Sequence, residues 1–300
     1  MSGLEAYLHR QRRRVDAALE AYFPLDPAHP HRLIEAVRYS LLGGGKRIRP
    51  IVVLAACECV GASSERALPY ACAIEMLHAY SLIHDDLPAM DDDALRRGRP
   101  TSHVVFGEGM AILAGDALLT EAFHVLAQCA ARDRQPRRAL RAVREIAEAA
   151  GARGMVGGQA ADLAAEGAVP DLATVEFIHV RKTGALLLAA VRTGAVIGGA
   201  SVAALKRLTR YGECLGLAFQ IADDILDVEA PSALTGKEPQ RDGARHKVTF
   251  PAVLGLPAAK QRARELREQA LAALARFDAH AAPLRDLVRF VVDRACEPSQ

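Results

Sequence analysis

The pattern of hydrophobic and polar positions predicts helices along almost the whole chain. Runs that alternate apolar and polar residues, as β-strands do, are nearly absent, and good helix formers such as Ala, Leu, Arg and Glu dominate. We therefore predict an all-α protein. The expected helices span about residues 4–22, 32–42, 50–60, 69–86, 111–130, 137–150, 155–165, 171–196, 201–227 and 258–277, followed by one more C-terminal helix.

Breaker residues separate these helices. Pro24, Pro27 and Pro30 interrupt the chain after the first helix, and Gly43-Gly44-Gly45 ends the second. Thr183-Gly184 is expected to interrupt the helix that begins near Asp171. Polar loops are predicted at 91–103 and at 231–246. Since no linker divides the helices, we expect one domain over residues 1–300.

Composition narrows the class of protein. Of the 300 residues, 51% are hydrophobic and 25% charged, which is typical of a globular protein and excludes disorder as the main state. The 38 basic and 36 acidic side chains leave a net charge of +2, which disfavours general binding to nucleic acid or to membrane surfaces. Aromatic residues make up only 5%, with no Trp, so a stacking-based single-strand binder is disfavoured too.

Membrane and secretion signals are not expected. No run of 18 apolar residues predicts a spanning helix, and no apolar stretch follows the basic N-terminal residues as it would in a secretory signal. The six cysteines form no CxxC pair and are interpreted as small core residues in a reducing compartment. We therefore expect a cytoplasmic protein.

Five aspartates fall between residues 85 and 93. Asp85 and Asp86 stand near the end of a helix that Pro88 should terminate, and three more aspartates occupy 91–93. Like charges this close repel one another, and the helix dipole disfavours negative charge at a C-terminus. Either solvent screens an ordinary acidic helix end, or cations neutralise it. Carboxylates as the only ligands suit a hard cation such as Mg²⁺.

A second acidic cluster lies on an otherwise apolar helix. Asp223 and Asp227 are four residues apart, with Asp224 between them, and Gln220 precedes Asp223 by three. This spacing predicts that Gln220, Asp223 and Asp227 share one face. A helix this apolar should be buried on most sides, so its carboxylates would need metal or basic partners. Two DDxxD-like clusters favour metal binding over a solvated helix end.

Other metal and catalytic sites have no support in the sequence. No His, Cys or Glu joins the two clusters at zinc-ligand spacing, and no motif indicates a Ser-His-Asp or Cys-His nucleophile.

Several basic residues stand close to the same segments. Lys46 and Arg49 follow the triple glycine, where the backbone can approach a ligand closely, and they can converge on one anion. The spacing is not that of a Walker A loop. Each cation alone would be an ordinary surface charge, but together with metal-binding carboxylates they predict a diphosphate site. The remaining cations of this set are Arg96, Arg97, Lys182, Lys237 and Lys247.

The helix before the first acidic cluster carries two more candidates. His78 stands seven residues before Asp85, hence on the same face, where it can donate a hydrogen bond to a phosphate group. The alternative is a satisfied core histidine. Tyr80 stands five residues before Asp85, and ordinary core packing is the alternative for it.

Taken together, the motifs resemble those of the bacterial short-chain trans-polyprenyl diphosphate synthases, most closely of the farnesyl diphosphate synthase type. The similarity extends from about residue 32 to the final helix. Its motifs are GGGKRIRP (43–50), HAYSLIHDDLPAMDDDALRRGRPTSH (78–103), GDALLT (115–120), GGQAADL (157–163), RKTGALL (181–187), FQIADDILD (219–227) and a GK…K-x-T-x-P segment (236–251).

The resemblance implies a fold and a set of site residues. The fold is a bundle of long antiparallel helices around a central cavity, usually in a homodimer, with three Mg²⁺ ions (Mn²⁺ as a substitute) held between the two aspartate motifs. The implied metal ligands, also catalytic, are Asp85, Asp86, Asp91, Asp223, Asp224 and Asp227. The implied isopentenyl diphosphate site consists of Lys46, Arg49, His78 and Arg97. The implied allylic diphosphate site, with further catalytic groups, consists of Arg96, Lys182, Thr183, Gln220, Lys237 and Lys247.

The resemblance also implies a reaction and a product. Isopentenyl diphosphate would condense with dimethylallyl and geranyl diphosphate by ionisation, condensation and elimination, giving (2E,6E)-farnesyl diphosphate. Tyr80 and Ser81 would form the chain-length gate, since an aromatic there, with the insertion in DDLPAMD, goes with a C15 product. Gln240 and His246 depart from glycines frequent in the family, which could alter closure over the allylic site.

Four alternatives stay open. The protein could make geranylgeranyl or geranyl diphosphate instead, or serve as a non-catalytic subunit of a heteromeric prenyl synthase, although both aspartate motifs are intact. A class I terpene cyclase is disfavoured by the second full DDxxD, the Lys46 and Arg49 pair and the few aromatics. A helical scaffold without activity gives no reason for buried carboxylates.

Overall fold

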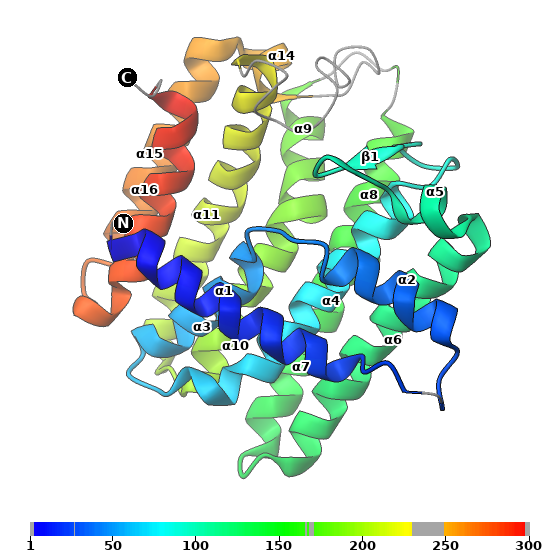
Figure 1. Ribbon diagram of the computed structural model, residues 1–300. Helices are drawn as coiled ribbons and strands as arrows, with labels where there is room; N and C mark the ends of the chain where they lie inside the picture. The colour runs from blue at the N-terminus through cyan, green and yellow to red at the C-terminus, as the bar shows by residue number, and fades with distance from the viewer. Residues whose placement is uncertain (1–2, 27, 166, 168–170, 230–248, 298–300) are drawn as a thin grey trace. The chain divides into compact units, whose positions relative to one another are not determined.

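The computed structural model describes residues 3–26, 28–165, 167, 171–229 and 249–297. Helices form nearly all of the regular structure in these ranges, so the predicted all-α fold is confirmed (Figure 1). The chain is divided into two compact units. The first contains residues 1–51 and 68–139, and the second contains residues 52–67 and 140–300.

The first unit contains four long helices, a short one and a two-stranded hairpin. A fifth long helix, α3 (Ile48–Cys59), begins in this unit and continues into the second. The elements are α1 (Gly3–Tyr22), α2 (His31–Leu41), α4 (Leu68–Asp85), β1 (Leu95–Arg96), β2 (Arg99–Pro100), α5 (Ser102–Phe106) and α6 (Glu108–Arg132).

The regular structure of the second unit is entirely helical over its described residues. Its elements are the rest of α3, the 3₁₀ turn η1 (Ser64–Ala67), α7 (Pro136–Ala150), α8 (Met155–Ala164), α9 (Leu172–His179), the π-turn η2 (Val180–Gly184), α10 (Ala185–Gly198), α11 (Val202–Glu229), α14 (Phe250–Leu254), α15 (Leu256–Ala273), the 3₁₀ turn η3 (Ala279–Ala281) and α16 (Ala282–Cys296).

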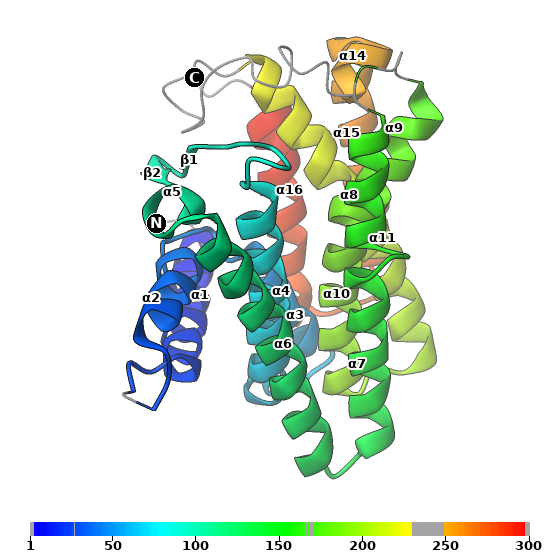
Figure 2. The same cartoon turned by 90° about the vertical axis from the view of Figure 1, so that its right-hand side faces the viewer.

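Helix α4 forms the centre of the first unit. Of its 18 residues, 11 are buried, which explains why its sequence is apolar on nearly every side. It packs on α6 and, less extensively, on α1 and α2 (Figure 2). Gly115 of α6 permits this close approach, because a Cβ atom there would lie 2.1 Å from Nε2 of His84. Glycine at 115 therefore leaves room for the His84 ring between the two helices.

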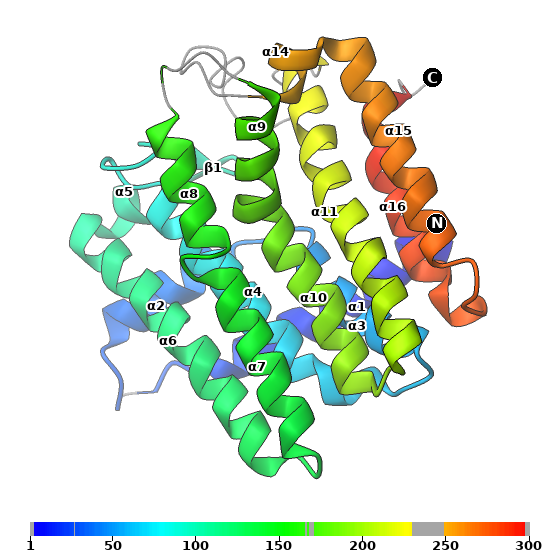
Figure 3. The same ribbon diagram turned by 180° about the vertical axis from the view of Figure 1, so that it is seen from behind.

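Helix α11 has the same central role in the second unit. It lies beside α10, α15 and α16, and α15 follows it along much of its length (Figure 3). Glycines allow close helix contacts here too. A Cβ on Gly194 of α10 would lie 2.1 Å from the carbonyl oxygen of Val53, and one on Gly216 of α11 would lie 2.9 Å from Cα of Gly184.

The predicted helix boundaries agree with the structure to within a few residues, with one exception. The segment 91–103 was expected to be an irregular polar loop, and it contains the β1–β2 hairpin and the start of α5. The two residues of the hairpin turn, Arg97 and Gly98, have φ of 55° and 72°. These values suit a two-residue hairpin turn of the primed type. The prediction missed it because Arg-Gly is not one of the usual sequences for such a turn.

Two further predictions, the helix interruption at Thr183-Gly184 and the lack of a membrane-spanning helix, can be compared with the structure. The predicted interruption at Thr183-Gly184 is confirmed as η2, and Asp171 caps α9 by accepting a hydrogen bond from Thr174 N at 2.7 Å. Among the described helices, α6 alone is long and apolar enough to span a membrane, with 39% of its most apolar window buried. A core helix of a soluble protein meets the same criterion, so this gives little support to a membrane span.

Candidate functional site

The glycine bend before α3 has an unusual backbone. Gly44 and Gly45 have φ of 98° and 135°, and Arg47 has φ of 53°. Left-handed conformations are expected for glycine and are unfavourable for arginine. The bend sets Lys46, an exposed residue, immediately before the buried Arg47 and three positions before Arg49. Lys46 is therefore carried by the bend, and Arg49 by the first turn of α3 that follows it.

The tip of the β1–β2 hairpin contacts this bend. Arg97 donates a hydrogen bond from Nη1 to the carbonyl oxygen of Gly44. Its guanidinium also fills the space beside Gly45, where a Cβ atom would come within 2.7 Å of Nη1. Gly45 is therefore needed both for its backbone angle and for the approach of Arg97. Two sequence-distant predicted residues, Lys46 and Arg97, are brought onto adjoining segments.

Tyr39 of α2 holds the hairpin from its other side. Its hydroxyl donates to the carbonyl oxygen of Pro100 at 2.7 Å, and the guanidinium of Arg99 lies 4.4 Å from the centre of its ring. Phe106 packs edge-on against the same ring. The hairpin is thus attached to α2, and its arginines have a defined position.

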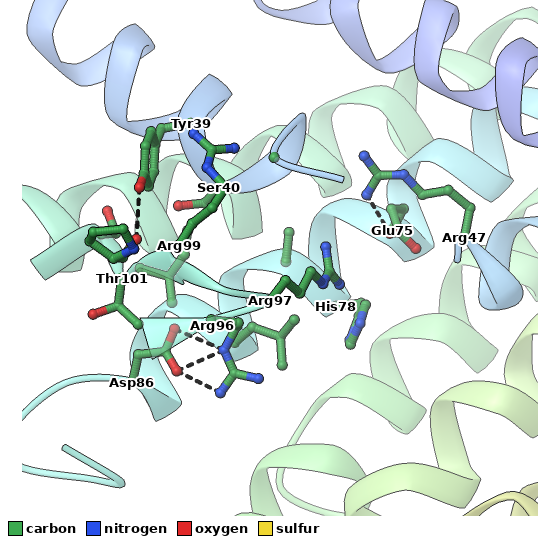
Figure 4. Close-up of a pocket in the computed structure, with 16 residues that line it drawn as sticks. Tyr39, Ser40, Arg47, Glu75, His78, Asp86, Arg96, Arg97, Arg99 and Thr101 are labelled. Carbon is green, nitrogen blue, oxygen red and sulfur yellow. Dashed lines mark hydrogen bonds and ion pairs between the residues drawn. The ribbon is translucent and has the colours of Figure 1, made fainter. Parts of the chain in front are cut away.

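These elements enclose a cationic pocket within the first unit (Figure 4). Helix α4 contributes Glu75 and His78 to its wall, and the hairpin contributes three arginines in succession around its turn. The lining cations are Arg47, Arg96, Arg97 and Arg99. Arg47 pairs with Glu75 and Arg96 with Asp86, so Arg97 and Arg99 leave the lining an excess of positive charge that is suited to a small polyanion.

His78 lies in the pocket beside Arg49. Arg49 Nη1 is 3.4 Å from Nε2 of His78, and since a guanidinium only donates, that nitrogen is the acceptor. Burial, followed by the positive charges of Arg49, Arg97, Arg96 and Arg47, holds the pKa of His78 well below its ordinary value of 6.5. The ring is therefore neutral at physiological pH, with its other nitrogen available as a donor. The prediction that His78 joins the cation cluster is consistent with this geometry.

The first aspartate motif folds back on the end of α4. Asp91 N donates to the carbonyl oxygen of Asp85 at 2.8 Å, and Asp93 N donates to that of Asp86 at 3.1 Å. Asp86 is buried and accepts from Arg96 Nε at 2.7 and 2.9 Å, with Nη2 at 2.5 Å (Figure 4). Burial raises the pKa of Asp86, and its hydrogen bond to Arg96 counteracts the effect. Arg96, expected at the allylic diphosphate site, is thus paired with a motif carboxylate.

The candidate chain-length gate lies one to two turns before this motif. Tyr80 is buried and packs edge-on against His84, with ring centres 5.8 Å apart. His84 Nε2 in turn lies 3.1 Å from the carbonyl oxygen of Ile112 and rests on Gly115. Ser81 donates to the carbonyl oxygen of His78 at 2.9 Å, so its hydroxyl is engaged with its own helix. Tyr80 is therefore the bulky member of the predicted pair.

In the second unit, the π-turn η2 presents Lys182 and Thr183. Close contact with its neighbours depends on Gly158, where a Cβ atom would lie 2.2 Å from the backbone nitrogen of Lys182. Lys182 pairs with Asp162 of α8 at 2.6 Å, and Thr183 donates to Gln220 Oε1 at 2.7 Å. π-turns in helices are frequent at functional sites. The structure thus brings the predicted Thr183 and Gln220 together.

The second aspartate motif has one buried and two exposed members. Asp224, only 5% exposed, accepts from His179 Nε2 at 2.8 Å, from Phe250 N at 3.0 Å and from Gln220 Nε2 at 3.0 Å. Asp223 and Asp227 are exposed within their unit, as their i,i+4 spacing predicts for one face. Of the three carboxylates, that of Asp224 lies in the buried surroundings predicted for this apolar helix, and those of Asp223 and Asp227 lie on its exposed face.

Comparison with known proteins identifies the fold family. Residues 30–282 match the model of the polyprenyl synthetase family. The chain belongs to the polyprenyl synthetase family. The resemblance inferred from the motifs is therefore confirmed, and with it the assignment of the protein as a short-chain prenyltransferase. Enzymes of this family use isopentenyl diphosphate and allylic diphosphates.

Individual relatives are similar over nearly the full length. A protein of Fischerella ambigua named dimethylallyltranstransferase is 47% identical over 292 residues, covering 97% of this chain and 84% of that protein. Geranylgeranyl pyrophosphate synthase 12 of Arabidopsis thaliana, chloroplastic, is 46% identical over 294 residues, covering 97% and 81%. A solved structure of a FPP/GFPP synthase from Zymomonas mobilis has a TM-score of 0.87 at 40% identity, covering 96% of this chain and 98% of that one.

The carboxylates of the polyprenyl synthetase motifs fit a hard cation. Asp85 and Asp91 offer oxygen ligands on a turn that holds their backbones together. Within the described ranges, no three His, Cys, Asp or Glu side chains form a complete metal site on their own. This is compatible with Mg²⁺, which takes one or two protein carboxylates and completes its shell with water and phosphate oxygens. Asp224 fits this role less well, because three hydrogen bonds already occupy its oxygens.

Four residues singled out in the sequence lie outside the described residues: Lys237, Gln240, His246 and Lys247. Sequence reasoning missed Arg47, Glu75, Asp162 and His179. A signal existed for one of them, since Glu75 is the single charge in the apolar run ACAIEML. The others look like ordinary polar residues until the fold brings their partners close.

Proposed function

We propose that the protein condenses isopentenyl diphosphate with dimethylallyl and geranyl diphosphate to give (2E,6E)-farnesyl diphosphate. The observation that carries the proposal is the cationic pocket at the end of α4, where arginines and a neutral histidine adjoin the carboxylates of the first aspartate motif. A site for diphosphate thus lies next to a site for the metal ions that assist diphosphate departure. Membership of the polyprenyl synthetase family supports the same chemistry.

Isopentenyl diphosphate would bind in this pocket. Lys46, Arg49 and Arg97 would neutralise its diphosphate, and His78 would donate a hydrogen bond from its protonated ring nitrogen. His78 and Arg97 line the pocket. Lys46 and Arg49 adjoin it, since Arg97 contacts the glycine bend that carries Lys46 and Arg49 contacts His78. Fixed charges of this kind hold the double bond of the substrate where it can attack, and proximity is a large part of the catalysis.

The allylic diphosphate would be bound by the remaining cations of the predicted set. We assign its diphosphate to Lys182 and Arg96, together with Lys237 and Lys247, which lie outside the described residues. Mg²⁺, with three ions per active site and Mn²⁺ as a substitute, would supply the positive charge that stabilises the departing diphosphate. The residues that would hold it come from the set Asp85, Asp86, Asp91, Asp223, Asp224 and Asp227. Within this set, Asp86 and Asp224 would contribute least, because hydrogen bonds already occupy their oxygens.

The protein's own groups would stabilise the allylic cation and shield it from water. The Oγ1 of Thr183, in contact with Gln220, offers partial negative charge near the reacting carbon. Apolar side chains around it exclude water that would quench the cation. No described side chain is needed as a base, because the released diphosphate can take the final proton.

Product length depends on Tyr80. A buried aromatic ring below the first motif would stop chain growth at C15, and its packing on His84 supports a fixed gate. The second candidate is a geranylgeranyl diphosphate synthase, favoured by the names of the plant relatives. The solved Zymomonas relative, named as a FPP/GFPP synthase, favours the C15 product or a longer one. A geranyl product or a role as a non-catalytic subunit of a heteromeric synthase has less support.

We also propose a cytoplasmic homodimer with one polyprenyl synthase domain over residues 1–300. Exposed Val104, Val105, Ile112 and Leu113 on α5 and α6 support an apolar interface between two copies. The six cysteines are free thiols, as expected in a reducing compartment. The family match from 30 to 282 extends through both compact units.

Product analysis tests the proposal. The purified protein is incubated with isopentenyl diphosphate, Mg²⁺ and each allylic diphosphate of C5, C10 or C15, and chain lengths are measured by chromatography. The C5 and C10 primers should give C15, and the C15 primer should be a poor substrate. C20 as the main product would support the second candidate, and no Mg²⁺-dependent condensation with any primer would refute the assignment.

A further inference from the structure

We infer that Arg47 and Glu75 are positioning residues for isopentenyl diphosphate, acting through Lys46 and Arg49 rather than touching the ligand. The inference rests on the proposed function of the pocket and adds residues to which the motifs assign no role. It starts from a conformational problem. Arg47 stands between the two cations, is 4% exposed, and has a left-handed backbone that arginine does not favour.

The guanidinium of Arg47 uses all three of its nitrogens. Nε donates to Asp16 Oδ1 at 2.8 Å, Nη1 donates to Glu75 Oε1 at 2.7 Å, and Nη2 donates to the carbonyl oxygen of Leu41 at 2.6 Å. These acceptors belong to α1, α4 and the last residue of α2. One side chain therefore ties the glycine bend to three helices, and its interactions hold the backbone in the unfavourable region.

The charges of the cluster indicate a fixed support and not a ligand-binding group. Burial lowers the pKa of Arg47, but Glu75 and Asp16 raise it by more, so the guanidinium stays charged and paired. The side chain of Glu75 is only 3% exposed, and Figure 4 shows it directed at Arg47. A buried charge that loses one partner is strongly unfavourable, so an incoming phosphate would have to compete with these carboxylates.

The position of the cluster links the glycine bend to helix α4. Glu75 lies on α4 three residues before His78, hence on the same face, and Arg47 directly follows Lys46. Movement of the Arg47 side chain would displace Lys46 on one side and the start of α3, with Arg49, on the other. The buried ion cluster thus sets the spacing between the bend cations and His78.

The experiment compares KM values in three variants of the full-length protein. Glu75→Gln keeps the shape of the side chain and removes its charge, and we expect KM for isopentenyl diphosphate to rise about tenfold while KM for geranyl diphosphate changes by less than about twofold. Asp16→Asn changes the half-exposed partner of Arg47 and should raise KM for isopentenyl diphosphate about threefold. Glu20→Gln is the matched control, since Glu20 pairs with Arg38 on the surface of the same unit and should change neither KM.

A double variant separates positioning from stability. R47M/E75L replaces the ion pair with apolar side chains, which commonly preserves folding, so the thermal unfolding midpoint should return close to that of the wild type. KM for isopentenyl diphosphate should stay raised, because the bend has lost its attachment. A normal KM in this variant would overturn the inference and leave only a structural role.

Two other results distinguish the remaining possibilities. A lower KM in Glu75→Gln would mean that Arg47, once released, binds the diphosphate itself, and this would also overturn the inference. Failure of the proposed function is visible separately, because the wild-type protein would then show no condensation at all. A wild-type enzyme that condenses normally, with unchanged KM values in every variant, would overturn the positioning role alone.

Discussion

The two aspartate motifs are similar in sequence but differ in how the fold uses them. Each has a buried aspartate that is engaged in side-chain hydrogen bonds, Asp86 in the first and Asp224 in the second, and the first motif also buries Asp91. Asp86 pairs with a cation, Arg96, on a hairpin that follows it in the chain. Asp224 accepts hydrogen bonds from a histidine, a glutamine amide and a backbone N–H drawn from three different elements.

This difference indicates that the two aspartates of each DD pair have different roles. The neighbouring Asp85 and Asp223 are more exposed than their buried partners. A carboxylate whose oxygens already accept several hydrogen bonds has little capacity left for a metal ion. We therefore expect the first aspartate of each pair to matter most for the reaction and the second to matter most for the local fold.

The largest expected effect comes from the more exposed aspartate of each DD pair. Asp85→Asn and Asp223→Asn should each lower kcat by roughly 10²–10³-fold, the range found when one charge-stabilising group is removed from an active site. Their unfolding free energies should stay close to that of the wild type. Initial rates at saturating substrates and Mg²⁺ measure the loss, with Asp286→Asn on α16 as an exposed control. A loss below about tenfold in either variant would contradict the expectation that the first aspartate of each pair matters most for the reaction.

The next effect concerns product length, which only the first motif is expected to influence. Tyr80→Ala removes the buried ring below Asp85 and should shift the main product from C15 to C20 or longer. Tyr80→Phe keeps the ring and should retain C15, which separates ring volume from the hydroxyl group. Chromatography of the dephosphorylated products measures both. Unchanged C15 from Tyr80→Ala would eliminate the gate.

A smaller effect is expected on stability from the buried members. Asp224→Asn retains one acceptor oxygen but turns an NH₂ group toward a donor, which should lower the unfolding free energy by about 1–3 kcal/mol. Asp86→Asn weakens one ion pair and should lower it by less. Urea denaturation followed by circular dichroism gives both values. A larger loss of unfolding free energy in Asp86→Asn than in Asp224→Asn would contradict the difference inferred between the motifs.

The smallest expected effect, on the free energy of unfolding, comes from an ion cluster outside both motifs. Glu145 is held by Arg192 at 2.8 and 2.9 Å and by Arg141 at 2.9 Å. Burial raises the pKa of Glu145, but the hydrogen bonds and charges of Arg192 and Arg141 outweigh it and lower the pKa below its ordinary 4.5. The resulting stability is present in full above pH 4.5 and is lost as the pH falls through the lowered pKa.

Glu145→Gln tests this pH dependence. It should lower the unfolding free energy by about 1 kcal/mol at neutral pH, and the difference from the wild type should vanish in acid. Urea denaturation at a series of pH values follows the change. A difference that persists unchanged in acid would show that Glu145 acts through packing and not through its charge.

Much of the fold was predictable because helices depend on local sequence. The boundaries of α1, α2 and α4 and the break at η2 follow from glycine, proline and the apolar pattern. The β1–β2 hairpin was missed because its turn depends on Arg97 adopting a positive φ, which is favoured by contact with Gly44 and not by the residue itself. Long-range contact decided the structure at that point.

Candidate members of the site could be predicted from the sequence, but their connections could not. Motif spacing singled out the aspartates, Lys46, Arg49, His78 and Gln220 as candidates, because each lies in a recognisable segment. It could not indicate that Arg96 would pair with Asp86, that His179 would hold Asp224, or that Arg47 would meet Glu75 and Asp16. These pairs join residues from separate elements, so no spacing rule relates them.

The sequence by itself determined that this protein is an all-α prenyltransferase with two acidic motifs and a cationic bend, since residue types and local spacing carry that information. Only the tertiary structure decided which carboxylates are buried and which groups hold them. The physical reason is desolvation: whether a charge binds a ligand or supports the fold depends on which partners surround it once water is removed, and packing alone sets those partners.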